Sequence, residues 1–259
     1  IATKGGLLFA GRTMTGGNRI PEKQVTIVTG GSGSIGRAIV AALGRLGHEI
    51  INLSLEPIDE ENVRNLIVDL TDADAIDRAL SDICGTERIT GLVNNAGFPY
   101  VTGIEDLDLD KVQGMIDIHC LSALRLMKGV TPSMRHAGYG RIVNIGSRMI
   151  LGRSGRSVYS LVKSGMLGVT RSLSLELAKD GVTVNMVSPG PIETPLFRKN
   201  HPPGAPETEA VLSAIPVGRI GVPEDVGNAV EFFMSPKSGF VTGQNLYVCG
   251  GGSVGSVLS

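Results

Sequence analysis

The chain has 259 residues, of which 42% are hydrophobic and 19% charged, a composition typical of a globular protein rather than a disordered one. Lys and Arg number 24 against 25 Asp and Glu, which argues against a dedicated nucleic-acid or membrane-surface binder, and no apolar run approaches the roughly 18 residues of a membrane span. The three cysteines, Cys84, Cys120 and Cys249, include no CxxC pair, so no disulfide framework and no metal site are predicted, and a reducing cytoplasm is expected.

Residues 1–24 are expected to be an irregular N-terminal arm or a leftover of cloning. Their apolar core is only Leu7-Leu8-Phe9, which is too short for a secretory signal. An arm that packs on another subunit is the alternative. The remainder, 25–259, is expected to be one domain that carries every functional site, because no linker, repeat or low-complexity tract divides it.

Short apolar runs then alternate with patterns of helical spacing. Strands are predicted at 25–29, 49–53, 66–68, 91–94, 141–145, 183–187 and 245–248. Helices are predicted at 35–46, 71–84, 109–127, 158–179 and 223–233. This alternation predicts an α/β protein with a doubly wound, Rossmann-like parallel sheet, built as three layers in a single domain.

Two connections depart from the regular alternation. The stretch 196–215 contains Pro202, Pro203 and Pro206 and is predicted to be an irregular functional lid. The connection 54–65 is so short that a helix of three turns barely fits.

The first strand runs into a glycine-rich turn, Thr29-Gly30-Gly31-Ser32-Gly33-Ser34-Ile35-Gly36, which opens a helix. Small residues let backbone N–H groups approach a pyrophosphate, and the helix N-terminus supplies a favourable dipole. A glycine-rich turn without a ligand is the structural alternative. The position of the turn, in the first strand-to-helix crossover, favours dinucleotide binding.

Four motifs in order resemble those of the short-chain dehydrogenase/reductase family. They are the turn at 29–36, Asn94-Asn95-Ala96-Gly97, the pair Tyr159-x-x-x-Lys163, and Pro189-Gly190-Pro191-Ile192-Glu193-Thr194, and the resemblance covers 25–252. It implies an NAD(P)-dependent oxidoreductase that interconverts a secondary alcohol and a ketone by hydride transfer. Ser34 departs from the family, which usually has Gly there, so the backbone approach to the cofactor is expected to be slightly altered.

Tyr159 and Lys163 lie four residues apart on a predicted helix and share a face. A neighbouring ammonium is expected to lower the phenol pKa of about 10, which would let the pair act as a general acid–base. The resemblance implies that Lys163 also binds the nicotinamide ribose and that Ser147 hydrogen-bonds the substrate oxygen. A solvent-exposed Tyr/Lys pair and a Ser that merely caps a turn are the structural alternatives. Ser147 lies twelve positions before Tyr159, one fewer than usual, so the intervening loop is expected to differ in shape.

His119 falls where the family commonly has an Asn that holds a water linking the Lys to solvent. A histidine can also donate or accept a hydrogen bond, so it is a candidate catalytic residue that keeps this relay and could make it pH-sensitive. A histidine with no catalytic role is the alternative.

The resemblance also implies a set of cofactor contacts: Gly30, Ser32, Ser34, Ile35, Gly36, Ser54, Asp69, Leu70, Asn95, Ala96, Gly97, Tyr159, Lys163, Pro189, Gly190, Ile192 and Thr194. Ser54 stands where an acidic residue would bind the ribose hydroxyls and select NAD. No basic residue fills the positions that bind the 2′-phosphate of NADP, and Arg37 is expected to point elsewhere. Glu56 would repel a phosphate, so either NAD(H) or NADP(H) is possible with NAD(H) slightly favoured. The short connection 54–65 is expected to leave the adenosine end open. Asp69 could instead be a simple helix-entry residue.

The expected substrate is a small alcohol or ketone, walled by 98–101, 148–157 and the lid. Arg148, Arg153 and Arg156 could clamp a substrate carboxylate or phosphate, although a solvent- or interface-facing role is favoured. A 3-oxoacyl-acyl-carrier-protein reductase of fatty acid biosynthesis is the enzymatic alternative, supported by the resemblance of 218–224, and a non-catalytic nucleotide sensor is the other. The resemblance also implies a homo-oligomer, a dimer or tetramer.

Overall fold

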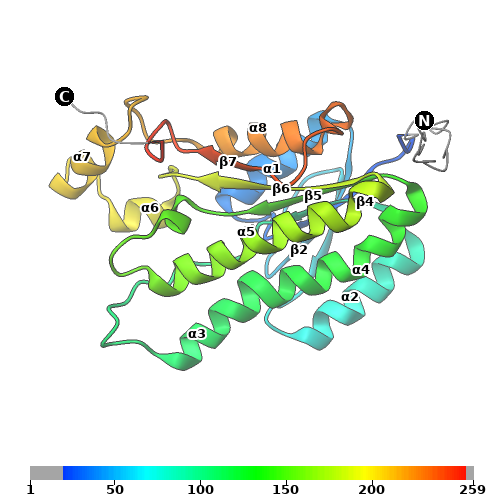
Figure 1. Ribbon diagram of the computed structural model, residues 1–259, viewed down its shortest axis with the longest axis horizontal. Coiled ribbons are helices and arrows are strands. Elements are labelled where there is room, and N and C mark those ends of the chain that lie inside the picture. The colour runs from blue at the N-terminus through cyan, green and yellow to red at the C-terminus, as the bar shows by residue number, and fades with distance from the viewer. Residues whose placement is uncertain (1–19, 255–259) are drawn as a thin grey trace, which may run out of the picture.

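The computed structural model describes residues 20–254, so the expected arm at 1–24 lies mostly outside the described residues. Seven parallel strands form one sheet in the order β3-β2-β1-β4-β5-β6-β7, which confirms the predicted fold (Figure 1). The strands are β1 (Val25–Thr29), β2 (Glu49–Ser54), β3 (Val63–Ile67), β4 (Ile89–Asn94), β5 (Gly140–Ile145), β6 (Val182–Pro189) and β7 (Asn245–Val248). The crossing from β3 to β4, on opposite sides of β1 and β2, reverses the strand order.

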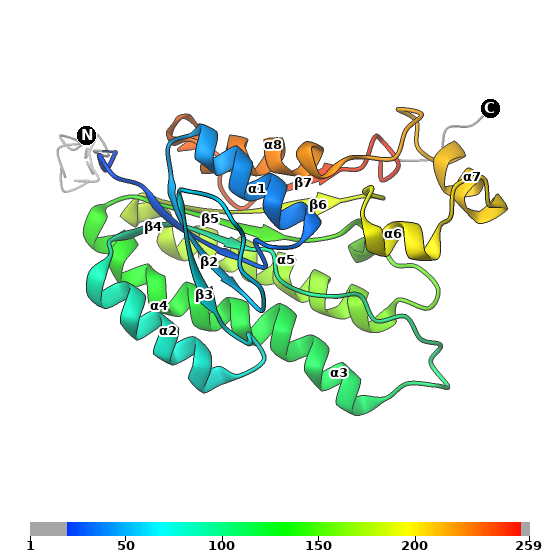
Figure 2. The ribbon, with the colours of Figure 1, turned by 180° about the vertical axis from the view of Figure 1, so that it is seen from behind.

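Helices cover both faces of the sheet. On one face α1 (Ser34–Arg45) packs against α8 (Pro223–Met234), as Figure 2 shows from behind. On the other lie α2 (Ala73–Thr86), α4 (Ser122–Ala137) and α5 (Ser157–Leu177). Two clusters of buried apolar side chains fill the spaces between the layers, one including Ile39 and Val230 and the other Leu126 and Met166. The central strands are therefore buried on both sides and consist mainly of apolar residues.

The predicted helix at 109–127 is longer and less regular than expected. It comprises α3 (Leu109–Ile116), one π-helical turn (Asp117–Leu121) and α4, which runs on to Ala137. The apolar spacing continues across a π-turn, because an inserted residue shifts the register without breaking the helix. Single π-turns of this kind occur frequently at functional sites.

The prediction that 196–215 is irregular was wrong. This stretch contains most of α6 (Pro195–Asn200) and all of α7 (Pro206–Ser213). The proline signals were misleading because Pro195 and Pro206 each stand at the first position of a helix, where proline is tolerated. The third strand also begins three residues earlier than predicted, at Val63.

No helix separates β2 from β3. The connecting residues 55–62 instead run back along the sheet, and the buried side chain of Ile58 joins the apolar cluster on the α1 face. The side chain of Asn65 fixes the backbone of Ile58, since it accepts from its N–H and donates to its carbonyl, both at 2.9 Å. A short loop thus does the covering that a helix usually does between parallel strands.

Candidate active site

The predicted site residues gather at the sheet edge where the parallel strands end. Thr29, the last residue of β1, accepts hydrogen bonds at Oγ1 from the backbone N–H groups of Asn95 at 2.8 Å and Ala96 at 2.9 Å. The side-chain amide of Asn95 donates to the carbonyl oxygens of Thr29 at 2.9 Å and Gly30 at 3.1 Å. The glycine-rich turn and the motif after β4 are therefore one hydrogen-bonded unit.

The glycine-rich turn has a backbone that larger residues would not allow. Gly30 has a φ of +64°, which glycine adopts without strain. A Cβ on Gly36 would lie 2.0 Å from the carbonyl oxygen of Gly30, so the first turn of α1 packs directly against this backbone. No side chain caps the N-terminus of α1 at Gly33. Backbone N–H groups at the positive end of the helix dipole are therefore available to an anion such as a pyrophosphate.

The residues expected at the adenosine ribose lie beside this turn. The Ser32 hydroxyl is hydrogen-bonded to the Ser54 hydroxyl, with their oxygens 2.9 Å apart, and to the carbonyl oxygen of Glu56. The loop after β2 thus folds against the turn, and this edge is less open than predicted. Arg37 also lies here, contrary to expectation, because its Nε donates to the carbonyl oxygen of Ser32 at 2.9 Å.

Asp69 forms a local turn after β3. Its Oδ1 accepts from both the N–H and the hydroxyl of Thr71, at 2.9 and 2.7 Å, and these bonds lower the pKa of the carboxyl group. The helix itself is capped by Asp72 rather than by Thr71. Asp69 thus shapes the entry to α2, and the side chain of Leu70 is buried.

Three of the four predicted catalytic side chains, those of Ser147, Tyr159 and Lys163, come from two adjacent segments of the chain. Ser147 lies two residues after the end of β5, and its Oγ accepts from the N–H of Met149 at 3.2 Å at the start of the 3-10 helix Arg148–Leu151. Tyr159 and Lys163 lie one turn apart on α5, with the Lys163 Nζ 5.6 Å from the centre of the Tyr159 ring. Lys163 is fully enclosed and donates to the carbonyl oxygen of Ile145 at 2.7 Å. A hydroxyl, a phenol and an ammonium therefore converge after β5.

Burial governs the protonation of this group. It lowers the pKa of Lys163 to about 8. It also raises the pKa of Tyr159 above its ordinary value, although the Ser147 hydroxyl and the charge of Arg156 act in the opposite direction. The expectation that the lysine lowers the tyrosine pKa is thus not met in the protein alone, because desolvation of the phenolate outweighs the neighbouring charges.

His119 lies in the π-helical turn and is buried against Tyr159. The two rings meet edge to face with centroids 5.6 Å apart. The His119 Nε2 donates to the carbonyl oxygen of Phe98 at 2.8 Å, which leaves Nδ1 as an acceptor. A Cβ on Gly97 would lie 2.0 Å from the His119 ring, so this glycine makes room for the imidazole.

Two buried polar atoms near Lys163 have no hydrogen-bond partner among the described residues, namely His119 Nδ1 and Asn94 Oδ1. Both residues line a small enclosed cavity together with Lys163. Its size and polar lining suit one water molecule, which would accept a hydrogen bond from the ammonium and donate hydrogen bonds to these acceptors. Burial and the charge of Lys163 lower the pKa of His119 to about 3, so a charge switch of His119 near neutral pH is not expected.

Replacing His119 by Asn is expected to keep kcat within about tenfold of the wild type, because an amide also accepts a hydrogen bond. The substitution should also reduce acid sensitivity. The unfolded state takes up a proton on His119 near pH 6.5 but the folded state only near pH 3, so stability falls as pH falls between these values, by up to about 1.4 kcal/mol per pH unit. Urea unfolding at pH 7 and 4.5 measures this difference. Complete loss of kcat would show a role that Asn cannot supply.

The segment leaving β6 is held close to β7. The Gly190 N–H donates to the carbonyl oxygen of Val248 at 2.8 Å, and a Cβ on Gly190 would lie 2.8 Å from the Cα of Cys249. Ile192 is buried, and Thr194 caps α6 by accepting from the Phe197 N–H at 3.1 Å. The predicted residues Pro189–Thr194 therefore form the side of the site opposite the glycine-rich turn.

One supporting group was missed from the sequence. The Asn94 amide donates to Asn144 Oδ1 at 2.8 Å, and the Asn144 amide donates to the Thr170 hydroxyl at 2.9 Å. This chain ties β4, β5 and α5 together beneath Lys163. The signal was an Asn inside an apolar strand, since a buried amide needs specific partners.

Within 20–254 no helix is long and apolar enough to cross a bilayer. In the same range no group of histidine, cysteine or acidic side chains is arranged to hold a metal ion.

The chain matches the family model described as enoyl-(acyl carrier protein) reductase over residues 30–253. It is 36% identical over 240 residues to a 3-oxoacyl-(acyl-carrier-protein) reductase of Buchnera aphidicola, covering 89% of this chain and 97% of that protein. It is 34% identical over 242 residues to the enzyme of the same name from Vibrio harveyi, with the same coverage.

Two solved structures are similar throughout. The aldohexose dehydrogenase of Thermoplasma acidophilum, in ligand-free form, superposes with a TM-score of 0.84 at 31% identity, covering 92% of this chain and 96% of that one. A putative NAD(P)-dependent gluconate 5-dehydrogenase of Beutenbergia cavernae, with NADP bound at low occupancy, gives a TM-score of 0.83 at 29% identity, covering 90% and 97%.

Proposed function

Because the chain belongs to the short-chain dehydrogenase/reductase family and is an NAD(P)-dependent oxidoreductase acting on CH–OH groups, we propose that Tyr159 is its general acid–base. The main observation behind this proposal is that Tyr159, Ser147 and Lys163 converge beside a glycine-rich helix N-terminus that no side chain caps. We further propose that 25–254 works as one unit containing both the cofactor and the substrate site.

The residues present fit a nicotinamide dinucleotide. Gly30 and Gly36 leave no side chain above the turn, and the first N–H groups of α1 suit its pyrophosphate. The contacts proposed for it are Gly30, Ser32, Ser34, Ile35, Gly36, Ser54, Asp69, Leu70, Asn95, Ala96, Gly97, Tyr159, Lys163, Pro189, Gly190, Ile192 and Thr194. When bound, the nicotinamide supplies the hydride acceptor for alcohol oxidation or the hydride donor for ketone reduction.

The proposed division of work follows from the hydrogen-bonding capacity of each side chain. The Tyr159 hydroxyl gives its proton to the substrate oxygen during reduction and takes it back during oxidation. The Ser147 hydroxyl donates a hydrogen bond to the same oxygen and stabilises its developing negative charge. Lys163, which is charged below about pH 8, stabilises the phenolate that Tyr159 becomes and returns its proton through the cavity beside His119.

We propose a preference for NAD(H) over NADP(H). Glu56 follows Ser54 at the ribose edge, and no basic residue occurs from Asn52 to Glu61; Arg37 is the one nearby opposing charge among the described residues of the turn and this loop.

We expect NADH to bind more tightly than NADPH in a fluorescence titration, since a 2′-phosphate would meet the carboxylate of Glu56. The Arg37→Gln variant removes the opposing charge and should weaken the binding of NADPH but not that of NADH. Tighter binding of NADPH by the wild type would reverse the assignment.

A second candidate function is reduction of a 3-oxoacyl group on an acyl carrier protein. The similarity to 3-oxoacyl-(acyl-carrier-protein) reductases from several bacteria favours it. Comparing kcat/KM for a 3-oxoacyl thioester on the carrier protein and on a short pantetheine mimic tests this candidate. A carrier-dependent gain would favour it, whereas equal values would favour a small-molecule substrate.

We also propose that the protein is a homo-oligomer, a tetramer, in the cytoplasm. Large apolar side chains are exposed on α4, α5 and α8 and in or near β7, namely Leu124, Leu161, Leu175, Phe232, Phe240 and Leu246. Exposed apolar side chains in such numbers are typical of surfaces that associate. The mass in solution, measured by light scattering, tests the proposed assembly.

A further inference from the structure

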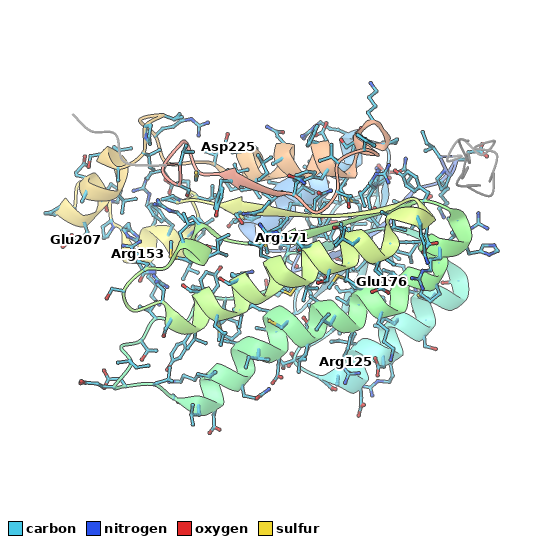
Figure 3. The ribbon with its side chains drawn as sticks, viewed as in Figure 1. Arg125, Arg153, Arg171, Glu176, Glu207 and Asp225 are labelled. Atoms are coloured by element: carbon cyan, nitrogen blue, oxygen red, sulfur yellow. The ribbon has the colours of Figure 1, made fainter. Side chains whose placement is uncertain are left out.

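Two arginines, Arg153 and Arg156, lie between the proposed catalytic residues Ser147 and Tyr159 in the sequence. Arg153 and Arg156 belong to the loop that links the 3-10 helix after Ser147 to α5, which carries Tyr159. Arg156 is the residue immediately before α5 and lies three positions ahead of Tyr159. Figure 3 labels Arg153 in this loop, at the end of α5, and Arg171 farther along the same helix.

The backbone of this loop is held in place by hydrogen bonds. The Arg156 N–H donates to the carbonyl oxygen of Arg153 at 3.1 Å, which closes a tight turn between the two arginines. The carbonyl oxygen of Arg156 accepts from the Ser160 N–H at 2.8 Å in the first turn of α5. On the outer side, the carbonyl oxygen of Gly155 accepts from the Thr102 N–H at 3.1 Å. The arginines are therefore presented from a fixed segment.

Neither guanidinium has an acidic partner within the described part of the chain. Other cations around the site are engaged: Arg148 donates to the carbonyl oxygen of Gly252 at 2.7 Å, and Arg198 is paired with Glu193 at 2.6 Å. Glu105 and Asp106, on the loop that contacts Gly155, form no ion pair with either arginine.

The two charges act on each other and on the catalytic tyrosine. Partial burial and the charge of Arg153 both lower the pKa of Arg156, whereas interaction with Tyr159 raises it. A partly desolvated guanidinium next to a like charge gains most from an added anion. The wall beside it is apolar, with Leu151, Phe98 and Val101 more than half exposed.

We propose that Arg153 and Arg156 form a subsite for an oxyanion, a carboxylate or phosphate, on the substrate whose alcohol or ketone reacts at Tyr159. The inference rests on the proposed function and adds the substrate class. In this proposal the substrate oxyanion lies near the start of α5. The carbon chain between the oxyanion and the reacting carbon lies along the apolar wall formed by Leu151, Phe98 and Val101. A planar guanidinium can hold either oxyanion through two parallel hydrogen bonds.

The test uses pairs of ketones that differ by one charge: 4-oxopentanoate and 5-oxohexanoate against their methyl esters, and dihydroxyacetone phosphate against dihydroxyacetone. For each compound, kcat and KM for reduction are measured with the preferred nicotinamide. Dissociation constants are measured by calorimetry in complexes with the oxidised cofactor, which bind the ketone without turnover. The proteins are wild type, Arg153→Gln, Arg156→Gln, Arg156→Lys and the control Arg171→Gln. The control removes an exposed arginine from α5, the helix that carries Tyr159.

The wild type should bind either the keto acids or the ketone phosphate at least tenfold more tightly than the corresponding neutral compounds. Whichever it prefers identifies the oxyanion as a carboxylate or a phosphate. Arg156→Gln should raise KM and Kd for the preferred charged compounds about tenfold or more, as expected for one lost charge-assisted hydrogen bond. It should change the KM and Kd of the neutral partner less than twofold. Arg156→Lys should restore part of the preference, and Arg171→Gln should change nothing.

Equal binding of charged and neutral partners by the wild type would overturn the subsite, as would an equal effect of Arg156→Gln on both. Reduction of the neutral ketones would then still support the proposed function. Failure to bind either nicotinamide would overturn the proposed function instead, and the subsite with it.

Discussion

Replacing Tyr159 by Phe is expected to lower kcat by about 10²- to 10⁴-fold, the usual contribution of a general acid–base. The substitution removes only the hydroxyl group. The ring keeps its edge-to-face contact with His119, and the glycine-rich turn is untouched. Steady-state kinetics should therefore show the loss in kcat, while the Kd for the nicotinamide cofactor, measured by fluorescence, stays within about twofold.

Tyr139→Phe is the matched control. Tyr139 is also buried, and its hydroxyl donates to Gln24 at 3.1 Å, but it lies just before β5, at the opposite edge of the sheet. Its loss should cost about 1 kcal/mol of stability and leave kcat unchanged. Undiminished turnover in Tyr159→Phe would remove the tyrosine from the mechanism.

Replacing Gly36 by Ala is expected to weaken dinucleotide binding by about 100-fold or more and to destabilise the fold by about 1–3 kcal/mol. The added Cβ would lie 2.0 Å from the Gly30 carbonyl oxygen and 2.7 Å from the Cα of Gly31. Both neighbours are backbone, so no side chain can rotate away. Either α1 or the turn must move, and the movement disturbs the N–H groups that face the pyrophosphate. Cofactor titration and urea unfolding measure the two effects.

Gly44→Ala in the same helix provides the control, because nothing lies within 4 Å of the new methyl group. It should leave binding unchanged and stabilise the helix by about 0.5–1 kcal/mol. If Gly36→Ala bound the cofactor as tightly as the wild type, the turn would not be the pyrophosphate site.

Local sequence patterns are sufficient for the parallel sheet and for the residues at its edge. The strand runs and the four motifs predicted the parallel sheet, the family and the residues that gather at its edge. Spacing alone placed Tyr159 and Lys163 on one helical face, which the structure confirms. The same patterns failed at 196–215, where proline begins helices instead of preventing them, and at the predicted helix 109–127, where one π-turn is hidden within a continuous apolar repeat.

The sequence by itself determined the alternation of elements, because apolar periodicity, glycine turns and caps act over a few neighbouring residues. Only the tertiary structure decided the electrostatics. Burial sets the pKa values of Lys163 and His119, and it depends on packing between segments far apart in the chain. The lack of an acidic partner for Arg156 among the described residues is likewise decided by which side chains the fold brings together. Long-range packing thus converts a set of recognisable motifs into a site with a defined charge.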